Sequence, residues 1–390
     1  MLPARALAVL TLVAFLPPGA LAEEARCRDD RGASPTGDWP SAADAVRAAR
    51  PAEAAALDAY AFTLDGPDAA RRGLRTDGLV IVHRGVVTYE RYGRGFGPAS
   101  RHLAWSVAKA ATNALAGVAA LRGAVTEDDS LCRHLAAAGP AHCKVALRDL
   151  LDSASGLDWT ESYEHRALQT SSVLAMLYGE GRRDMAAFVL THAQAATPGS
   201  AWRYSSGDAV LLAAAVDRAM VRSGAAPGWP SELLFQPLGM SSAVLERDAA
   251  GTLVGSSYLY ATPRDLARLG WLYLQDGCWR GKALLPAGWV AASTQPSRPF
   301  RAPGGARRAR DGAMGRGFWT NRPAPEVGLA GPPWPGAPED AYAARGHWGQ
   351  EVVVIPSEEM VIVRTADDRE PGVLDLGKLI ALSIAAGRLP

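Results

Sequence analysis

The sequence contains very little lysine. Of the 41 lysine and arginine residues in the 390-residue chain, only four are lysine, at positions 109, 144, 282 and 378. Cysteine is equally scarce, with four residues, and neither a Cys-x-x-Cys nor a His-Glu-x-x-His spacing occurs. The chain therefore lacks the common patterns of a zinc site, and it predicts neither a metal nor a cofactor.

The chain also lacks an excess of either charge, since 41 basic residues face 40 acidic ones. No stretch alternates basic with aromatic residues, so nucleic acid is not an expected partner. Apolar residues make up 48% of the chain, which is typical of a globular protein. A length of 390 residues favours two lobes, and the sequence leaves the oligomeric state open.

Long apolar runs are missing everywhere except at the N-terminus, which reads MLPARALAVLTLVAFLPPGALAEE. One arginine, an apolar run and the small-residue end Ala20-Leu21-Ala22 are typical of a secretory signal peptide, with cleavage expected after Ala22. The alternative is a membrane anchor, but Pro17-Pro18-Gly19 interrupt the run and it is short for a span. We therefore expect a periplasmic or secreted protein with no stable membrane span after cleavage.

Export allows disulfide bonds to persist. The four cysteines permit three pairings. Cys132 and Cys143 flank a short segment containing a turn, and we predict that they pair, which leaves Cys27 with Cys278.

Hydrophobic periodicity predicts an α/β fold, with an antiparallel sheet flanked by helices and an inserted all-helical domain. Expected hairpins lie at residues 77–93 and at 349–366, the second turning at Pro356-Ser357. Expected helices lie at 51–64, at 262–277 after a Thr-Pro cap, and at 373–386, whereas 295–345 is expected to be long loops around one strand near Phe318 and Trp319. The predicted organisation is a signal peptide (1–22), an N-terminal arm (23–60) that is extended to about residue 48, an α/β domain (61–110 and 251–390) and a mainly helical domain (111–250).

One of the rare lysines, Lys109, stands three residues after Ser106 at the start of the helical pattern LAWSVAKAATNALAGVAALRGAV. The i, i+3 spacing places both side chains on one helix face. Burial and the helix dipole both disfavour an ammonium there, and lysine, unlike arginine, can lose its proton. The pattern suggests a serine beside a base. On its own it fits equally a helix cap next to a solvated lysine.

Two later motifs make the catalytic interpretation stronger. Tyr204 begins a Tyr-Ser-Ser sequence before an apolar helix, and His347-Trp348-Gly349 opens a late strand. Alone, each could be ordinary packing or a loop junction. In this order, Ser-x-x-Lys, Tyr-Ser-Ser and His-x-Gly resemble the serine β-lactamase and penicillin-binding superfamily, and most closely its class C-related branch. Family VIII esterases and 6-aminohexanoate-dimer hydrolases are the nearest group, and the likeness covers about residues 75–388.

The resemblance implies a role for each residue. Ser106 would be the nucleophile, Lys109 its base and Tyr204 the proton shuttle to the leaving group, although which of Lys109 and Tyr204 acts first stays open. The backbone N–H groups of Ser106 and Gln350 would form the oxyanion hole. Substrate would contact His347, Trp348, Gly349, Ser206 and Tyr163.

Two departures from the β-lactamase pattern bear on the substrate. Ser206 stands where that branch has asparagine, and His347 replaces a lysine, so a permanent charge for a substrate carboxylate is missing. The sequence therefore predicts an exported serine hydrolase that acts on a small ester or amide. A β-lactamase or D-Ala-D-Ala carboxypeptidase is the alternative enzyme, and a sensor that binds ligand without hydrolysis is the alternative of another class.

Overall fold

The computed structural model describes residues 27–28, 30–164, 167–302 and 312–390. The predicted signal peptide, with its cleavage site after Ala22, lies outside the described residues. Among the residues that are described, no helix is long and apolar enough to cross a membrane.

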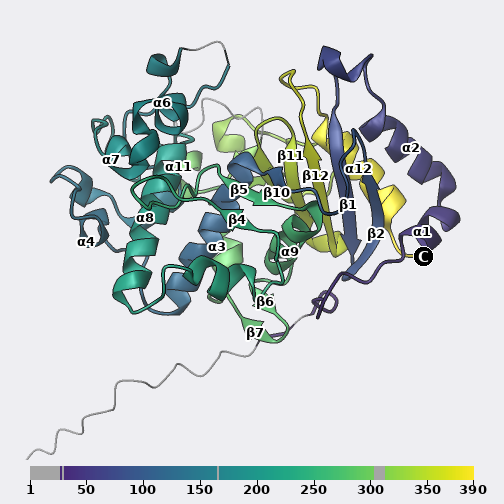
Figure 1. Cartoon of the computed structure of the whole chain (residues 1–390), viewed down its shortest axis with the longest axis horizontal. Coiled ribbons are helices and arrows are strands. Elements are labelled where there is room, and N and C mark those ends of the chain that lie inside the picture. The colour runs from purple at the N-terminus through teal and green to yellow at the C-terminus, as the bar shows by residue number, and fades with distance from the viewer. Residues whose placement is uncertain (1–26, 29, 165–166, 303–311) are drawn as a thin grey trace, which may run out of the picture.

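A seven-stranded antiparallel sheet forms one half of the molecule (Figure 1). The strand order is β2-β1-β12-β11-β10-β9-β8. Their bounds are β1 Thr76–His83, β2 Val86–Tyr92, β8 Ala313–Met314, β9 Trp319–Thr320, β10 Tyr342–Gly346, β11 Gln350–Ile355 and β12 Met360–Ala366. Both predicted hairpins are confirmed, because β1 pairs with β2 and β11 pairs with β12. The predicted loop region 295–345 contains the short strands β8 and β9 and most of β10, where we expected one strand.

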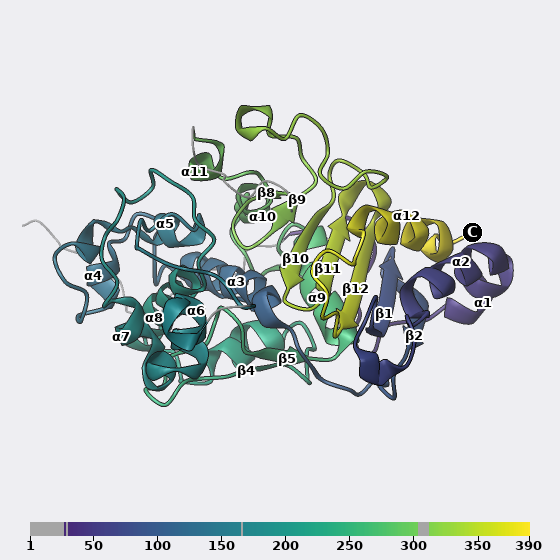
Figure 2. The same cartoon turned by 90° about the horizontal axis from the view of Figure 1, so that it is seen from above.

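Helices cover both faces of this sheet. On one face, α2 (Pro51–Phe62) and α12 (Leu376–Gly387) pack on apolar side chains such as Leu79, Val353 and Ile362. The other face meets α9 (Pro263–Leu274), which begins at the predicted cap Thr262. Every residue of β1 and β12 is buried as a result. Figure 2 shows the sheet between α9 and α12.

The other half of the molecule is mainly helical (Figure 1). It contains α3 Ala108–Leu121, α4 Leu131–His134, α5 Leu147–Leu151, α6 Ser172–Tyr178, α7 Met185–Val189 and α8 Ser206–Arg222, with the π-helical turn Ser231–Phe235. Short 3₁₀ helices occur at 68–70, 105–107, 142–144, 168–170, 180–183, 325–327 and 356–358. The described part also contains two small sheets and two short helices. One sheet has the order β3-β5-β4 (His102–Leu103, Leu259–Ala261, Val244–Leu245), and the other is β6-β7 (Cys278–Trp279, Lys282–Ala283). The helices are α10 (Trp289–Ser293) and α11 (Arg298–Arg301).

The N-terminal segment differs from the extended arm that we predicted. Residues Ala43–Ala49 form a helix, α1, beside strand β2. The alanine-rich sequence ADAVRAA has high helix propensity, and Val46 is buried. Trp39 is also buried, with its indole N–H donated to the carbonyl of Arg264 at 3.1 Å. The segment is therefore part of the packed structure around the sheet.

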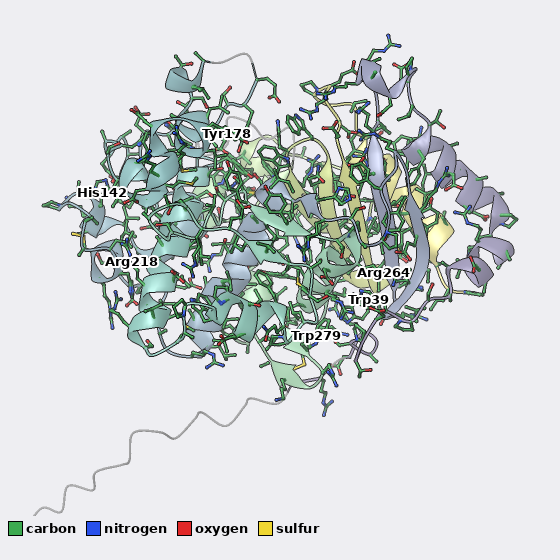
Figure 3. All side chains as sticks on the ribbon, in the orientation of Figure 1. Trp39, His142, Tyr178, Arg218, Arg264 and Trp279 are labelled. Carbon is green, nitrogen blue, oxygen red and sulfur yellow. A yellow bond between two sulfur atoms is a disulfide. The ribbon has the colours of Figure 1, made fainter. Side chains whose placement is uncertain are left out.

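Both predicted disulfides are present, Cys132–Cys143 and Cys27–Cys278. They lie far apart, because His142, next to Cys143, is at the left of Figure 3 and Trp279, next to Cys278, is at the bottom. The first closes a short loop of sequence separation 11, and the second fastens the N-terminal segment across a separation of 251.

We expect removal of Cys27–Cys278 to destabilise the protein more than removal of Cys132–Cys143. In the chain-entropy model the two bonds stabilise by about 5 and about 3 kcal/mol, because a longer loop restricts the unfolded chain more. The measurement is chemical denaturation of the paired alanine variants, Cys27→Ala with Cys278→Ala and Cys132→Ala with Cys143→Ala. A larger loss from the second pair would contradict this account.

Candidate active site

Ser106 lies at the boundary between the sheet and the helical region. It is the middle residue of the 3₁₀ turn at 105–107, which continues directly into α3. The residue before it, Trp105, has a φ of 49°, which is unfavourable for a bulky side chain. The buried Trp105 ring packs edge-on against Tyr163, His347 and Trp348. This aromatic packing holds Trp105 in its strained conformation and so fixes the start of the Ser106 turn.

Lys109 is buried beside Ser106, with 6% of the residue exposed. Its Nζ lies 3.0 Å from Ser106 Oγ, 3.0 Å from Ser206 Oγ and 3.1 Å from the carbonyl oxygen of Ser256. The helix spacing thus brings the predicted serine and lysine into direct contact.

Tyr204 lies against the same lysine. The centre of its ring is 4.8 Å from Lys109 Nζ, and the ring stacks on Trp319 of β9 at 5.8 Å. The next residue, Ser205, caps α8 by accepting a hydrogen bond from the backbone N–H of Asp208. The Tyr-Ser-Ser motif is therefore a helix start, which sets Tyr204 beside Lys109 and Ser206 on the first helical turn.

Glu161 belongs to this cluster, although the sequence analysis did not find it. It accepts hydrogen bonds from the Ser206 backbone N–H at 2.9 Å, the Ser206 hydroxyl at 2.6 Å and the Trp159 indole at 2.6 Å. The hydroxyl of Tyr163 lies 3.4 Å from the same carboxylate. Burial first, and the Glu161 charge second, raise the pKa of Tyr163 well above its usual value, so Tyr163 is a neutral hydrogen-bonding group.

His347, Trp348 and Gly349 form the turn between β10 and β11. The His347 ring stacks on Tyr163 at 4.6 Å, and its Nε2 is 3.1 Å from a carboxylate oxygen of Glu164. Burial lowers the pKa of His347, while Glu164 opposes that shift. The imidazole is therefore mostly uncharged at neutral pH. This agrees with the expectation that histidine, in place of the lysine of β-lactamases, offers no permanent charge.

The turn requires glycine at position 349. Gly349 has a φ of 87°, and a Cβ there would lie 2.4 Å from Arg364 Nη1 and 2.5 Å from Asp368 Oδ2. Those two atoms form a buried ion pair at 2.7 Å. The guanidinium of Arg369 lies 3.3 Å from the centre of the Trp348 ring.

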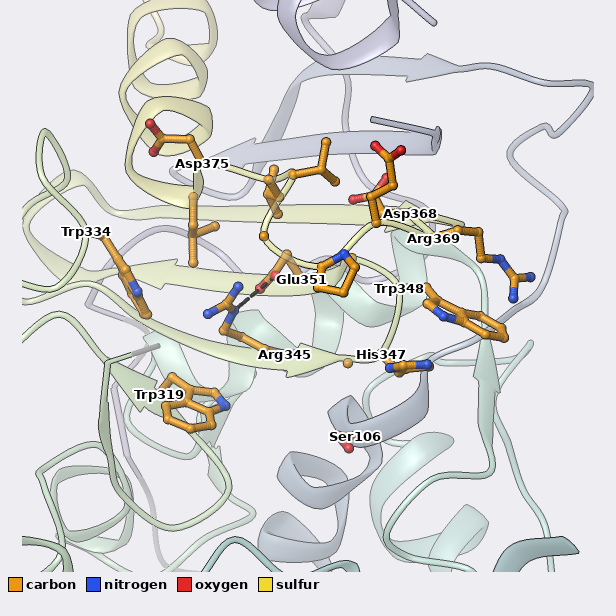
Figure 4. Close-up of a pocket in the computed structure, with 18 of the residues that line it drawn as sticks. Ser106, Trp319, Trp334, Arg345, His347, Trp348, Glu351, Asp368, Arg369 and Asp375 are labelled. Atoms are coloured by element: carbon orange, nitrogen blue, oxygen red, sulfur yellow. Dashed lines mark hydrogen bonds and ion pairs between the residues drawn. The ribbon is translucent and has the colours of Figure 1, made fainter. Parts of the chain in front are cut away.

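A cavity of about 510 Å³ opens over Ser106. Its walls include Tyr163, Tyr204, Trp319 and the turn from Gly346 to Gly349. Figure 4 shows the cavity extending from Ser106 past His347, across the end of β10 to Arg345 and Glu351, with Trp319 and Trp334 on one side. The predicted nucleophile therefore faces a space large enough for a small organic substrate.

Gln350, whose backbone N–H is a predicted oxyanion donor, is the first residue of β11. It is absent from the residues that line the cavity, and it lies opposite Gly346 in the β10–β11 pairing. Its buried side chain instead donates hydrogen bonds to the carbonyls of His347, Trp348 and Ala366. Because the turn is only three residues long, Gln350 already belongs to β11, and β10 is the strand beside Ser106.

Gly346 permits β10 to approach the Ser106 turn. A Cβ at this position would lie 2.3 Å from the backbone carbonyl oxygen of Ala104, two residues before Ser106. We expect Gly346→Ala to slow covalent labelling of Ser106 at least tenfold, because either β10 or the Ser106 turn must move. Labelling by an active-site-directed fluorophosphonate, followed by intact mass, provides the rate.

Gly97→Ala is the matched control for this substitution, since a Cβ at Gly97 meets no atom within 4 Å. It is expected to label at the wild-type rate. A Gly346→Ala protein that labels equally fast would show that the close approach of β10 is unnecessary for the site.

Comparison with known proteins agrees with this geometry. The β-lactamase family model matches residues 52–385. The match begins in α2, so the likeness includes part of the segment that we had placed outside it. The 6-aminohexanoate-dimer hydrolase of Paenarthrobacter ureafaciens is 26% identical over 242 residues, which are 60% of this chain and 61% of that protein's length.

Solved structures share the fold. A Bacillus anthracis protein with the provisional name 6-aminohexanoate-dimer hydrolase superposes with a TM-score of 0.63 and 24% identity, covering 80% of this chain and 79% of the other. The hydrolase EstCE1 gives a TM-score of 0.63 at 16% identity, covering 87% of this chain and all of the other. The chain therefore belongs to the β-lactamase family, within the serine β-lactamase and penicillin-binding superfamily.

Proposed function

We propose that the protein is an exported hydrolase that cleaves a small ester or amide through an acyl-enzyme on Ser106. The observation that carries this proposal is the 3.0 Å contact between Lys109 Nζ and Ser106 Oγ at the floor of the cavity. A buried amine at that distance is positioned to remove the hydroxyl proton as the oxygen attacks a carbonyl carbon.

The reaction proceeds in two halves. Lys109 takes the Ser106 proton, and the bond from Ser106 Oγ to the substrate carbonyl carbon forms. Tyr204, whose ring lies against Lys109, delivers a proton to the leaving alcohol or amine as the ester or amide bond breaks. Water then attacks the acyl-enzyme, its proton passes to the same groups, and the carboxylic acid leaves Ser106 with its hydroxyl restored.

The negative oxygen of the tetrahedral intermediate needs backbone donors. The Ser106 N–H is one of them in this proposal. We assign the second donor to the His347 turn rather than to Gln350, because that turn lines the cavity with Ser106 and Gln350 does not. Each such donor is worth about 3 kcal/mol in the transition state.

Several features favour a neutral ester or amide over a β-lactam. His347 is mostly uncharged, so it offers a substrate carboxylate no permanent charge. Ser206 provides a hydroxyl where an amide stands in β-lactamases of the class C-related branch. The name of the Paenarthrobacter relative refers to a hydrolase of a 6-aminohexanoate dimer, which is consistent with a small amide substrate. The two disulfides are compatible with export.

The test is covalent labelling with a fluorophosphonate, read by intact mass and peptide mapping, beside hydrolysis of p-nitrophenyl esters, p-nitroanilides and a chromogenic cephalosporin. We expect a label on Ser106 and turnover of an ester or anilide that exceeds turnover of the cephalosporin. Preferred hydrolysis of the cephalosporin would identify a β-lactamase instead. A stable label without turnover of any substrate would favour the sensor.

A further inference from the structure

We propose that Glu161 is a positioning residue for the base, acting through Ser206 to aim the lone pair of Lys109 at Ser106. This inference rests on the proposed function, since it concerns how Lys109 is oriented to take the Ser106 proton. The residues form a continuous chain: Ser106 Oγ, Lys109 Nζ, Ser206 Oγ and Glu161 Oε1, with successive distances of 3.0, 3.0 and 2.6 Å.

Glu161 acts in this chain as a carboxylate. Its Oε2 accepts N–H donors from the Ser206 backbone and the Trp159 indole, and its Oε1 accepts the Ser206 hydroxyl. The two N–H partners can only donate, so Oε2 is an acceptor, and an ionised Oε1 accepts the hydrogen of the Ser206 hydroxyl. The first turn of α8 adds its favourable dipole, because Ser206 is the first helical residue.

The carboxylate fixes the direction of the Ser206 hydroxyl. A serine hydroxyl has a single hydrogen, and here that hydrogen points to Glu161. Ser206 Oγ can therefore only accept in its contact with Lys109. The Ser256 carbonyl, the other buried partner of Lys109, can also only accept.

These two acceptors determine how the N–H bonds and the lone pair of a neutral Lys109 amine are oriented. Uncharged Lys109 has two N–H bonds and one lone pair, arranged tetrahedrally. Ser206 Oγ and the Ser256 carbonyl each require one N–H, which leaves the lone pair directed at Ser106 Oγ. Without Glu161, the Ser206 hydroxyl could donate to the lysine lone pair, and an N–H would then point at Ser106. Glu161 thus excludes the unproductive arrangement without touching the substrate or the nucleophile.

The alternative is that Glu161 only anchors its loop to α8. A double-mutant cycle separates the two roles, using Glu161→Gln, Ser206→Ala and the combined variant, with fluorophosphonate labelling of Ser106 as the readout. We expect Glu161→Gln to lower kinact at least tenfold while KI stays within twofold. The combined variant should label within twofold of Ser206→Ala alone, because the residue through which Glu161 acts is already gone.

The proposal would be overturned if the rate losses of Glu161→Gln and Ser206→Ala multiplied in the combined variant. It would also be overturned if the Glu161→Gln protein labelled at the wild-type rate. Glu180→Gln, a change of an exposed acid in the same helical half, is the control and should match wild type. If Glu161→Gln does not fold, Ser206→Thr, which keeps the hydroxyl, should label within fivefold of wild type while Ser206→Ala loses at least tenfold. Equal rates for those two variants would overturn it. Failure of wild type to label at Ser106 would instead remove the proposed function itself.

Discussion

Replacing Ser106 with alanine is expected to remove covalent labelling completely and to lower ester hydrolysis by about 10⁴-fold or more, because the acyl-enzyme can no longer form. The loss should appear in kcat rather than in KM, since the cavity keeps its walls. The melting temperature should change little: alanine keeps the helix start, and Lys109 retains Ser206 and Ser256 as partners. Initial rates on a p-nitrophenyl ester and a thermal melt test both statements.

The matched control is Ser223→Ala, which removes the hydroxyl of an exposed serine at the C-terminal end of α8. It should retain wild-type activity and labelling. An undiminished label on the Ser106→Ala protein would place the nucleophile on another residue and would require a new assignment of the site.

Much of the fold could be predicted because its signals are local. The hairpin β1–β2 and the hairpin β11–β12 are marked by β-branched runs around short turns. Helix α9 is marked by the Thr262 cap and a following proline. The contact between Ser106 and Lys109 is equally local, since one helical turn joins them. Each of these features depends on periodicity or on turn chemistry within about twenty residues.

The remaining features depend on contacts between distant segments. Glu161 meets Ser206 across 45 residues, and no spacing rule links an acidic residue in a loop to a helix start. Gln350 was assigned to the oxyanion hole by motif position alone, whereas its pairing with Gly346 and the three-residue turn between them appear only in the folded hairpin. The left-handed conformation of Trp105 follows from packing against Tyr163 and the His347 turn, which only the folded chain brings together.

Substitution of Lys109 by arginine tests the mechanism directly, because arginine can make the same hydrogen bonds but cannot act as the base that takes the Ser106 proton. Lys109→Arg supplies N–H donors for Ser206 and Ser256, yet a guanidinium does not lose its proton in a protein and so cannot act as the base. We expect labelling of Ser106 to slow by about 10²- to 10⁴-fold, the usual contribution of a general base. Lys109→Met, which has no N–H donor, should lose at least as much and should also be less stable, because Ser206 and Ser256 lose a buried partner.

Lys378→Arg provides an unusually close control. The Lys378 ammonium lies 4.8 Å from the centre of the Tyr60 ring, the same distance as Lys109 Nζ from the Tyr204 ring. Lys378 is exposed and does not belong to the Ser106 site. Labelling in this variant should equal wild type, which would show that losing a lysine over an aromatic ring is not itself harmful. If Lys109→Arg labels within tenfold of wild type while Tyr204→Phe does not label, the first proton goes to Tyr204. A slow Lys109→Arg protein beside a fast Lys378→Arg protein assigns that step to the buried amine.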